Sequence, residues 1–138
     1  MSSTQPAGRA GPLSGIRVLL VEDETLVAML LEDMVADLGG VVVGSASRVG
    51  RALDLVRERG DEIDLAVLDV NLGGEDAFPV ASVLAERGVP FVFSTGYGSA
   101  GLPEPWRSRP TLQKPFTQTQ VETVFRQALD GAAGAARD

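Results

Sequence analysis

Leu65-Ala66-Val67-Leu68-Asp69 is a short apolar run that ends directly on a carboxylate. Three more apolar runs have the same form, since each leads at once into a polar or charged residue. They are Val18-Leu19-Leu20-Val21 before Glu22-Asp23, Phe91-Val92-Phe93 before Ser94-Thr95, and Thr111-Leu112-Gln113 before Lys114-Pro115-Phe116. Short apolar runs separated by helical patterns indicate buried strands of a parallel sheet. The chain therefore predicts several parallel strands, each followed by a polar group at its carboxyl end.

Helical patterns fill the segments between and after these runs. Glu24 to Leu38 repeats apolar residues every three or four positions, which is the spacing of one helical face. The predicted strands are Arg17–Val21, Val41–Val43, Ile63–Leu68, Pro90–Phe93 and Thr111–Gln113. The predicted helices are Glu24–Leu38, one from a cap at Ser47 to a stop at Gly60, Asp76–Arg87 with Pro79 in its first turn, and one from a capping box at Thr117 and Gln120 to Leu129. We expect flexible tails at residues 1–15 and 131–138, on either side of one domain at residues 16–130.

This alternation of strands and helices predicts an α/β fold, a doubly wound five-stranded parallel sheet in the flavodoxin-like order 2-1-3-4-5 with helices on both faces. The third predicted strand is the most apolar and is expected at the centre. In open parallel sheets, sites form just beyond the carboxyl ends of the strands. Glu22, Asp23 and Asp69 are therefore expected to converge there. Thr95 and Lys114 are expected at the same edge.

The residue composition excludes several classes of function. The 138 residues hold no cysteine and no histidine, which rules out disulfides, thiolate nucleophiles, histidine bases and phosphohistidine on this chain. The net charge of −7 repels a phosphate backbone, so we expect no direct binding to DNA or RNA. No apolar run reaches the ~18 residues of a membrane helix, and the first residues lack the apolar centre of a secretory signal. We therefore expect a cytoplasmic protein without a membrane partner.

The predicted sheet edge suits a hard cation. Glu22, Asp23 and Asp69 place three carboxylates in a small volume, where they repel one another unless something positive lies between them. Oxygen ligands without Cys or His favour a hard cation, and Mg²⁺ is the cofactor that we expect. The neighbouring Glu24 is interpreted as a solvated acid at the start of a helix, where it suits the helix dipole.

The remaining strand-end residues have the groups that phosphoryl chemistry needs. Asp69 follows the most apolar predicted strand, and a carboxylate there is a candidate nucleophile that forms an aspartyl phosphate. The hydroxyl of Thr95 is a candidate donor to a phosphoryl oxygen. Lys114 is the only lysine among twelve basic residues and offers a compact charge to a carboxylate or a phosphate. Because Pro115 follows it directly, the Lys114–Pro115 peptide bond is a candidate for the cis form.

The weakest pattern lies at residues 96–105, which hold three glycines and two prolines. A long helix cannot begin in such a segment, and only a short helix near Trp106 is expected. Because the segment has few apolar anchors, we interpret it as the mobile element of the domain.

Four segments together resemble the receiver domain of two-component response regulators. They are Val21-Glu22-Asp23-Glu24, Leu68-Asp69-Val70-Asn71, Ser94-Thr95-Gly96 and Lys114-Pro115-Phe116. The resemblance runs over residues 16–129 and implies a single-domain response regulator of a phosphorelay. Since no output domain is seen after these residues, we expect another protein to read the phosphorylated state or to receive the phosphoryl group.

The resemblance also assigns roles to single residues. It implies that a sensor histidine kinase or a phosphotransfer protein phosphorylates Asp69. The Mg²⁺ ligands that it implies are Glu22, Asp23, Asp69 and the backbone carbonyl of Asn71. Thr95 and Lys114 would then close on the phosphate and reshape a signalling face.

Departures from the family pattern bear on signalling. Thr111 stands where the family often has an aromatic switch residue, and Gly73 stands where many receivers have proline. The stretch Pro90-Phe91-Val92-Phe93-Ser94-Thr95-Gly96-Tyr97-Gly98 resembles an alphaproteobacterial subfamily, frequently stand-alone, with the motif Pro-Phe-x-Phe-Ala-Thr-Gly-x-Tyr and often no aromatic switch. Ser94 replaces the alanine of that motif, and the tyrosine arrives one residue early. The candidate signalling residues are therefore Tyr97, Trp106 and Thr111.

Two other functions are consistent with part of the pattern. A haloacid-dehalogenase-like phosphatase also combines a strand-end Asp nucleophile with Thr or Ser, Lys and Mg²⁺. It has a second catalytic Asp where this chain has Asn71, and its metal-binding acids come late in the chain. A degenerate receiver would act only as a binding module. As a receiver the chain is not an enzyme on other molecules, because it would catalyse only its own phosphorylation and dephosphorylation.

Overall fold

A computed structural model of the chain describes residues 13–96, 102–104 and 106–137, with side chains up to residue 131. The main strands are β1 Arg17–Val21, β2 Val41–Ala46, β3 Leu65–Asp69, β6 Phe91–Thr95 and β7 Thr111–Gln113. They form a five-stranded parallel sheet in the order β2-β1-β3-β6-β7. Two short strands, β4 Asn71–Leu72 and β5 Glu75–Asp76, form a separate antiparallel hairpin. The main sheet thus has the predicted order 2-1-3-4-5, and the predicted fold is confirmed.

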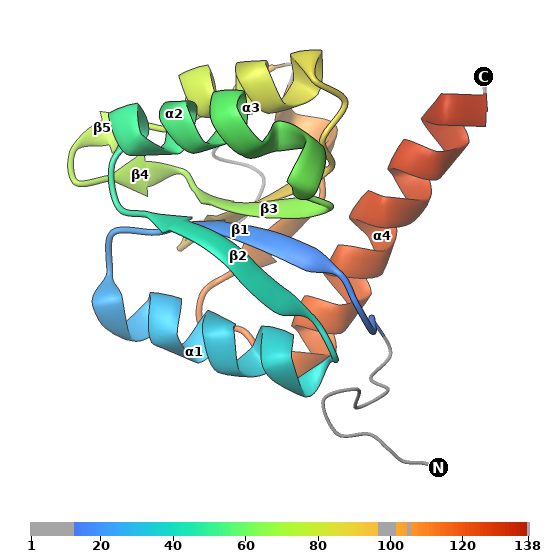
Figure 1. The fold of residues 1–138 in the computed structure, drawn as a ribbon. Coiled ribbons are helices and arrows are strands. Elements are labelled where there is room, and N and C mark those ends of the chain that lie inside the picture. Colours follow the sequence, from blue (N-terminus) through green and yellow to red (C-terminus); the bar gives the residue numbers. More distant parts are fainter. Residues whose placement is uncertain (1–12, 97–101, 105, 138) are drawn as a thin grey trace, which may run out of the picture.

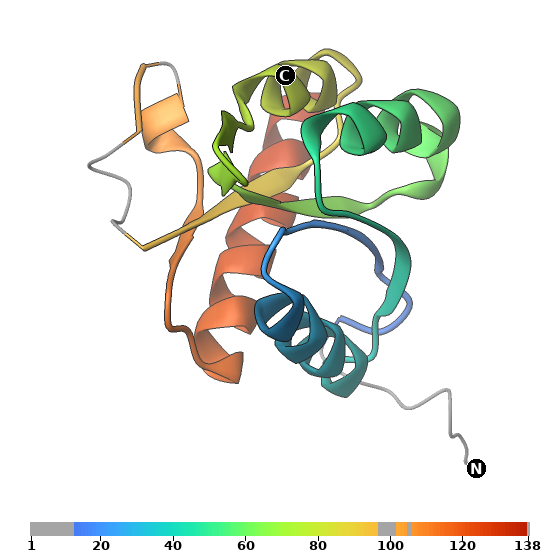
Figure 2. The same ribbon diagram turned by 90° about the vertical axis from the view of Figure 1, so that its left-hand side faces the viewer.

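Helices cover both faces of the sheet. They are α1 Thr25–Asp37, α2 Val49–Arg59, α3 Phe78–Glu86 and α4 Gln118–Arg137, with single 3-10 turns η1 Gly60–Glu62 and η3 Trp106–Ser108. α2 and α3 lie on one face, and α1 and α4 lie on the other (Figure 1). Figure 2 shows the same layers along another direction, with α1 across the sheet from α2 and α3. Within the described part of the chain, none of the helices combines the length and apolar character needed to cross a bilayer.

The alternation of side chains along the strands divides the core in two. Successive residues of a strand point to opposite faces of a sheet. In β3, Ala66 and Leu68 belong to the apolar cluster under α2 and α3, whereas Leu65 and Val67 belong to the cluster under α1 and α4. All five residues of β3 are buried, as expected for the central strand of a parallel sheet. Asp69 thus ends a strand that is covered on both sides.

The N-terminal boundary differs from the predicted tail at residues 1–15. Residues 1–12 lie outside the described part of the chain. Leu13 is buried in the cluster under α1 and α4, and its N–H donates to the carbonyl of Leu38 at 2.8 Å. Gly15 donates likewise to the carbonyl of Gly39 at 2.9 Å. These residues therefore pack against the end of α1, because an apolar side chain is available to be buried there.

The starts and ends of two helices also differ from the prediction. α2 begins after Arg48 rather than Ser47, without a capping bond from its own side chain. The N–H of Val49 instead lies 3.4 Å from Oε1 of Glu75, on the hairpin strand β5. α4 continues past Gly131 to Arg137, where a tail was expected, since its last turns are rich in alanine, the best helix former.

Other local predictions agree with the structure. Thr117 and Gln120 form the predicted capping box: the N–H of Thr117 donates to Oε1 of Gln120 at 2.8 Å, and the N–H of Gln120 donates to Oγ1 of Thr117 at 3.2 Å. Pro79 lies in the first turn of α3, and the Lys114–Pro115 peptide bond is cis. The short helix expected near Trp106 is η3.

Apolar side chains in and directly after the segment at residues 96–105 reach the core. Leu102 is buried in the cluster under α2 and α3. Trp106 packs edge-on against Phe91 and Phe93, with ring centroids 6.0 and 6.1 Å apart. Leu102 is therefore an apolar anchor within residues 96–105, where few were expected, and Trp106, directly after that segment, also packs against the core. Residues 97–101 lie outside the described part of the chain.

Candidate functional site

Four side chains of the predicted site lie at the carboxyl edge of the sheet. Glu22 follows β1, Asp69 ends β3, Thr95 ends β6 and Lys114 follows β7. The strand ends are level, since Asp69 lies opposite Ser94 in the pairing of β3 with β6. Asp69, Thr95 and Lys114 line a cavity of about 590 Å³ at this edge. The structure thus brings together four residues that are far apart in the sequence, as the topology predicts.

Lys114 lies between three carboxylates. Its Nζ is 2.9 Å from Oε1 of Glu24, 3.1 Å from Oδ2 of Asp69 and 3.3 Å from Oε1 of Glu22. Partial burial alone would lower the pKa of Lys114. The hydrogen bonds to Glu24 and Asp69, with the charges of Asp69 and Glu22, outweigh burial and raise that pKa. The side chain is therefore an ammonium at every physiological pH.

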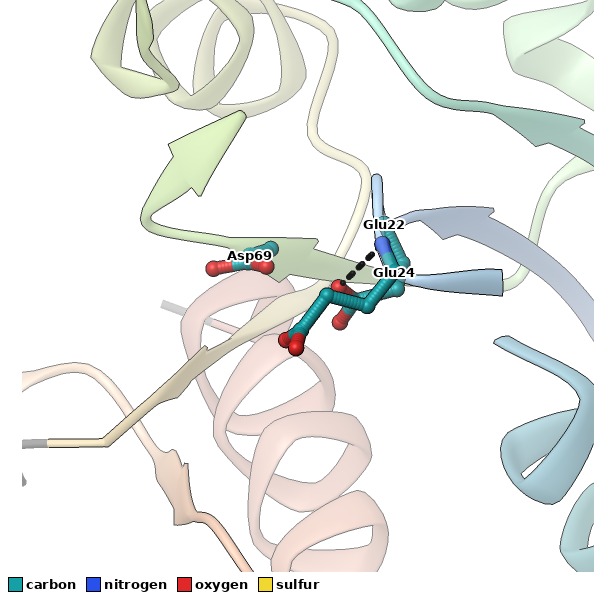
Figure 3. Close-up of side chains that lie close together, drawn as sticks. All are labelled: Glu22, Glu24 and Asp69. Atoms are coloured by element: carbon teal, nitrogen blue, oxygen red, sulfur yellow. Dashed lines mark hydrogen bonds between the residues drawn. The ribbon is translucent and has the colours of Figure 1, made fainter. Parts of the chain in front are cut away.

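Glu22 is a buried carboxylate that is poorly satisfied. Burial and, next, the neighbouring Asp69 raise its pKa to about 7, against the opposing effects of the Glu24 amide and Lys114. Its Oε2 accepts the N–H of Glu24 at 3.0 Å, the bond drawn in Figure 3. Its Oε1 has no hydrogen bond in the described part of the chain, because the Lys114 ammonium lies near it without hydrogen-bond geometry. A second positive charge beside Oε1 would therefore stabilise the ionised form of this carboxylate.

Glu22 and Asp69 offer carboxylate oxygens that fit a magnesium ion. In the described residues, one group of acids has carboxylate oxygens within 4.8 Å of one another, and it consists of Glu22, Glu24 and Asp69 (Figure 3). Oε1 of Glu22, which accepts no hydrogen bond in the described part of the chain, supplies an oxygen for a second positive partner besides Lys114. Hard oxygen ligands of this kind suit Mg²⁺, which binds through one or two carboxylates and keeps several waters.

Asp23 lies beside this group rather than inside it. Its carboxylate lines the same cavity, but Oδ2 accepts the N–H of Gly73 at 2.9 Å. Asn71, the other implied ligand, donates its N–H to Oδ1 of Asp69 at 3.1 Å, and its own Oδ1 accepts the N–H of Gly74 at 2.9 Å. The roles of Asp23 and Asn71 as metal ligands stay predictions.

Sequence reasoning missed Glu24. The residue precedes α1 as its N-cap, but its side chain makes no capping hydrogen bond. Instead the carboxylate reaches Lys114, 90 positions further along the chain. Its position after Glu22 and Asp23 was the only available signal, and that signal fits a helix start equally well.

Of the three candidate signalling residues, the structure describes Trp106 and Thr111. Tyr97 lies outside the described residues. Trp106 is half-buried against the core, with the guanidinium of Arg109 5.8 Å from its ring centroid. Thr111 is half-buried in β7, and its Oγ1 donates to the carbonyl of Arg109 at 3.0 Å. Trp106 and Thr111 are not among the described residues that line the cavity at Asp69. Trp106 packs against Phe91 and Phe93 of β6, and β7, which holds Thr111, pairs with β6.

Comparison with known proteins gives concordant results. Residues 18–126 match the family described as response regulator receiver domain. The chain is 34% identical over 118 residues to the phyllosphere-induced regulator PhyR of Methylorubrum extorquens, a match of 81% of this chain and 43% of that protein. It is 32% identical over 117 residues to the transcriptional regulatory protein PdtaR of Mycobacterium tuberculosis, covering 82% of this chain and 56% of that protein. The chain thus spans about half the length of these relatives.

A solved structure is similar over nearly its whole length. The solution structure of SdrG from Sphingomonas melonis Fr1 is 46% identical, with a TM-score of 0.75. The match covers 83% of this chain and 97% of SdrG. The family match at residues 18–126 includes Asp69, Thr95 and Lys114.

Proposed function

The chain belongs to the response regulator receiver domain family, and we propose that it accepts a phosphoryl group on Asp69 from a sensor histidine kinase or a phosphotransfer protein. In the transfer, the bond from phosphorus to the donor histidine nitrogen breaks, and a bond from phosphorus to an Asp69 carboxylate oxygen forms. The single observation that carries the proposal is the place of Asp69. It is a buried carboxylate at the end of the central strand, on a cavity, 3.1 Å from the only lysine.

The other residues of the site have separable roles in this proposal. Mg²⁺ would be held by Glu22 and Asp69 together with two predicted ligands, Asp23 and the backbone carbonyl of Asn71, and would neutralise charge on the transferring group. Lys114 would pair with a phosphoryl oxygen, because its ammonium already lies beside the carboxylate that gains the group. Thr95, buried at the end of β6, would donate its hydroxyl to the same group.

An apolar surface beside the site supports docking of a protein donor. α1 exposes Leu26, Met29 and Leu30, which are 80%, 54% and 45% exposed. Leu30 also lines a groove of about 340 Å³ together with Pro115 and Phe116. Exposed apolar patches next to a site mark protein interaction surfaces. We therefore propose that the phosphodonor binds across α1 and the loop after β7, and that a downstream protein reads the phosphorylated state.

The test is chemical phosphorylation of the purified chain. Incubation with Mg²⁺ and acetyl phosphate is expected to add one acid-stable, base-labile phosphoryl group, detected by intact mass, and Asp69→Asn is expected to lose it. Asp33→Asn is the control, because Asp33 is an exposed acid of α1 outside the site. Labelling that persists in Asp69→Asn contradicts the proposal. Rapid release of phosphate without a retained adduct supports the phosphatase instead, and no reaction supports a binding module.

A further inference from the structure

Glu24 makes the shortest contact of the Lys114 ammonium. Its Oε1 lies 2.9 Å from Nζ, compared with 3.1 Å for Oδ2 of Asp69. The Glu24 side chain makes no capping bond to α1, so nothing local in the helix explains its direction. The interaction therefore crosses from the start of α1 to the end of β7, and it positions the one ammonium that the proposed phosphoryl transfer needs.

The two principal carboxylate partners of Lys114 differ in how easily water replaces the ammonium. The side chain of Glu24 is 60% exposed, whereas that of Asp69 is 7% exposed. A carboxylate in water loses little when an ion pair opens, but a buried carboxylate left without its partner is costly. When a phosphoryl group is transferred to Asp69, breaking the ion pair with Glu24 therefore costs Lys114 less free energy than breaking the one with Asp69.

Glu24 and Lys114 also lie at the border between two cavities of the surface. Among the described residues, they are the two that line both the cavity at Asp69 and the apolar groove along α1. The Glu24–Lys114 ion pair therefore lies between the cavity at Asp69 and the surface where the phosphodonor is proposed to bind.

We propose that Glu24 is a positioning residue that holds Lys114 in a resting position and releases it when a phosphoryl group arrives on Asp69. The proposal rests on the function proposed above. Removing the Glu24 carboxylate places Lys114 nearer its phosphoryl-bound position in advance. The affinity for a phosphoryl mimic therefore rises, while the fold is unchanged.

The single lysine makes the position of Lys114 directly observable. Protein labelled with ¹³C-lysine gives one side-chain Hε–Cε signal, which belongs to Lys114. Without ligand, Glu24→Gln is expected to move this signal toward its position in the wild-type complex with Mg²⁺ and beryllofluoride. With beryllofluoride bound, the wild-type and Glu24→Gln signals are expected to coincide, because Lys114 has left Glu24 in both.

Two further variants separate a direct contact from a change of net charge. Glu32→Gln removes the same charge from an exposed position of α1 outside the site and is expected to leave the signal in place. Glu24→Asp keeps the charge but shortens the reach, and is expected to behave like Glu24→Gln. In titrations at saturating Mg²⁺, Glu24→Gln is expected to bind beryllofluoride about two- to five-fold more tightly, as suits a partly exposed ion pair.

Several outcomes overturn the inference. It fails if the Lys114 signal of the free protein is the same in wild type and Glu24→Gln, or if Glu24→Asp behaves like wild type. It also fails if Glu24→Gln binds beryllofluoride more weakly, because Glu24 would then belong to the metal site. Wild-type protein that binds no beryllofluoride contradicts the proposed function, whereas the comparison of the free proteins still decides whether Glu24 holds Lys114.

Discussion

The backbone N–H of Gly73 donates a 2.9 Å hydrogen bond to Oδ2 of Asp23, across 50 positions of sequence. This bond ties the loop after β1 to the turn of the β4–β5 hairpin. Gly73 and Gly74 have φ of 59° and 93°, as a tight hairpin turn requires. Proline has neither the N–H nor access to that φ. Glycine at this position, where many receivers have proline, therefore lets the hairpin hold a predicted metal ligand.

Substitution of Gly73 tests the link between the turn and Asp23. Gly73→Pro is expected to lower the free energy of unfolding by about 1–3 kcal/mol, because it strains the turn and removes the donor. It is also expected to weaken Mg²⁺ binding, measured by calorimetry. Gly73→Asn is the control, since asparagine tolerates positive φ and keeps the N–H. Equal Mg²⁺ affinity in the proline variant and wild type would show that the hydrogen bond does not position Asp23.

Mg²⁺ is expected to stabilise the folded chain. At ten times its dissociation constant, the ion adds about 1.4 kcal/mol to the free energy of unfolding if it binds the folded state alone. Asp23→Asn is expected to reduce this gain without unfolding the protein, because Asp23 is exposed and removal of its charge leaves the core intact. Urea unfolding with and without Mg²⁺ measures the gain, and Asp33→Asn serves as the charge control. The same gain in Asp23→Asn as in wild type removes Asp23 from the metal site.

The exposed face of α1 is expected to be needed for phosphorylation by a protein donor but not by a small-molecule donor such as acetyl phosphate. Leu26→Ala removes a side chain that is 80% exposed and keeps a good helix former, so stability changes little. Phosphotransfer from a cognate histidine kinase is expected to slow about ten-fold, whereas phosphorylation by acetyl phosphate stays unchanged. Val41→Ala, at an exposed apolar residue of β2, is the matched control. Slowing with both donors would mean that the substitution disturbs the site itself.

The Arg17–Asp64 ion pair predicts a pH-dependent contribution to stability. The Arg17 guanidinium contacts both carboxylate oxygens of Asp64 at 3.1 Å, and its hydrogen bonds hold the pKa of Asp64 below its usual value. A lowered acid pKa contributes stability above the unfolded value of about 3.9, and that stability is lost as the pH falls through the folded value. The difference in unfolding free energy between wild type and Asp64→Asn is therefore expected to be constant near neutral pH and to shrink below about pH 4. Salt is expected to reduce it, and a difference that grows on acidification would contradict the assignment.

Much of the fold and of the candidate site follows from local patterns. Strand alternation and helical spacing are set by neighbours a few positions away, so they can be read without tertiary information. The same alternation places Glu22 and Asp69 two positions after Leu20 and Val67, on the face under α1 and α4. Helix bounds were less predictable. The first N–H of α2, that of Val49, donates to the carboxylate of Glu75 on the hairpin, and nothing near Ser47 in the sequence indicates that contact.

The sequence by itself determined which residues stand at the carboxyl edge of the sheet, because each polar residue directly follows an apolar strand and the strands are parallel. Only the tertiary structure decided how these side chains pair. Glu24 reaches Lys114 over 90 positions, and Asp23 accepts from Gly73 over 50. Such contacts depend on the paths of loops and on side-chain rotamers, which local periodicity does not encode. The physical reason is that burial patterns specify the face of an element, whereas a hydrogen bond requires two atoms to meet within about 3 Å.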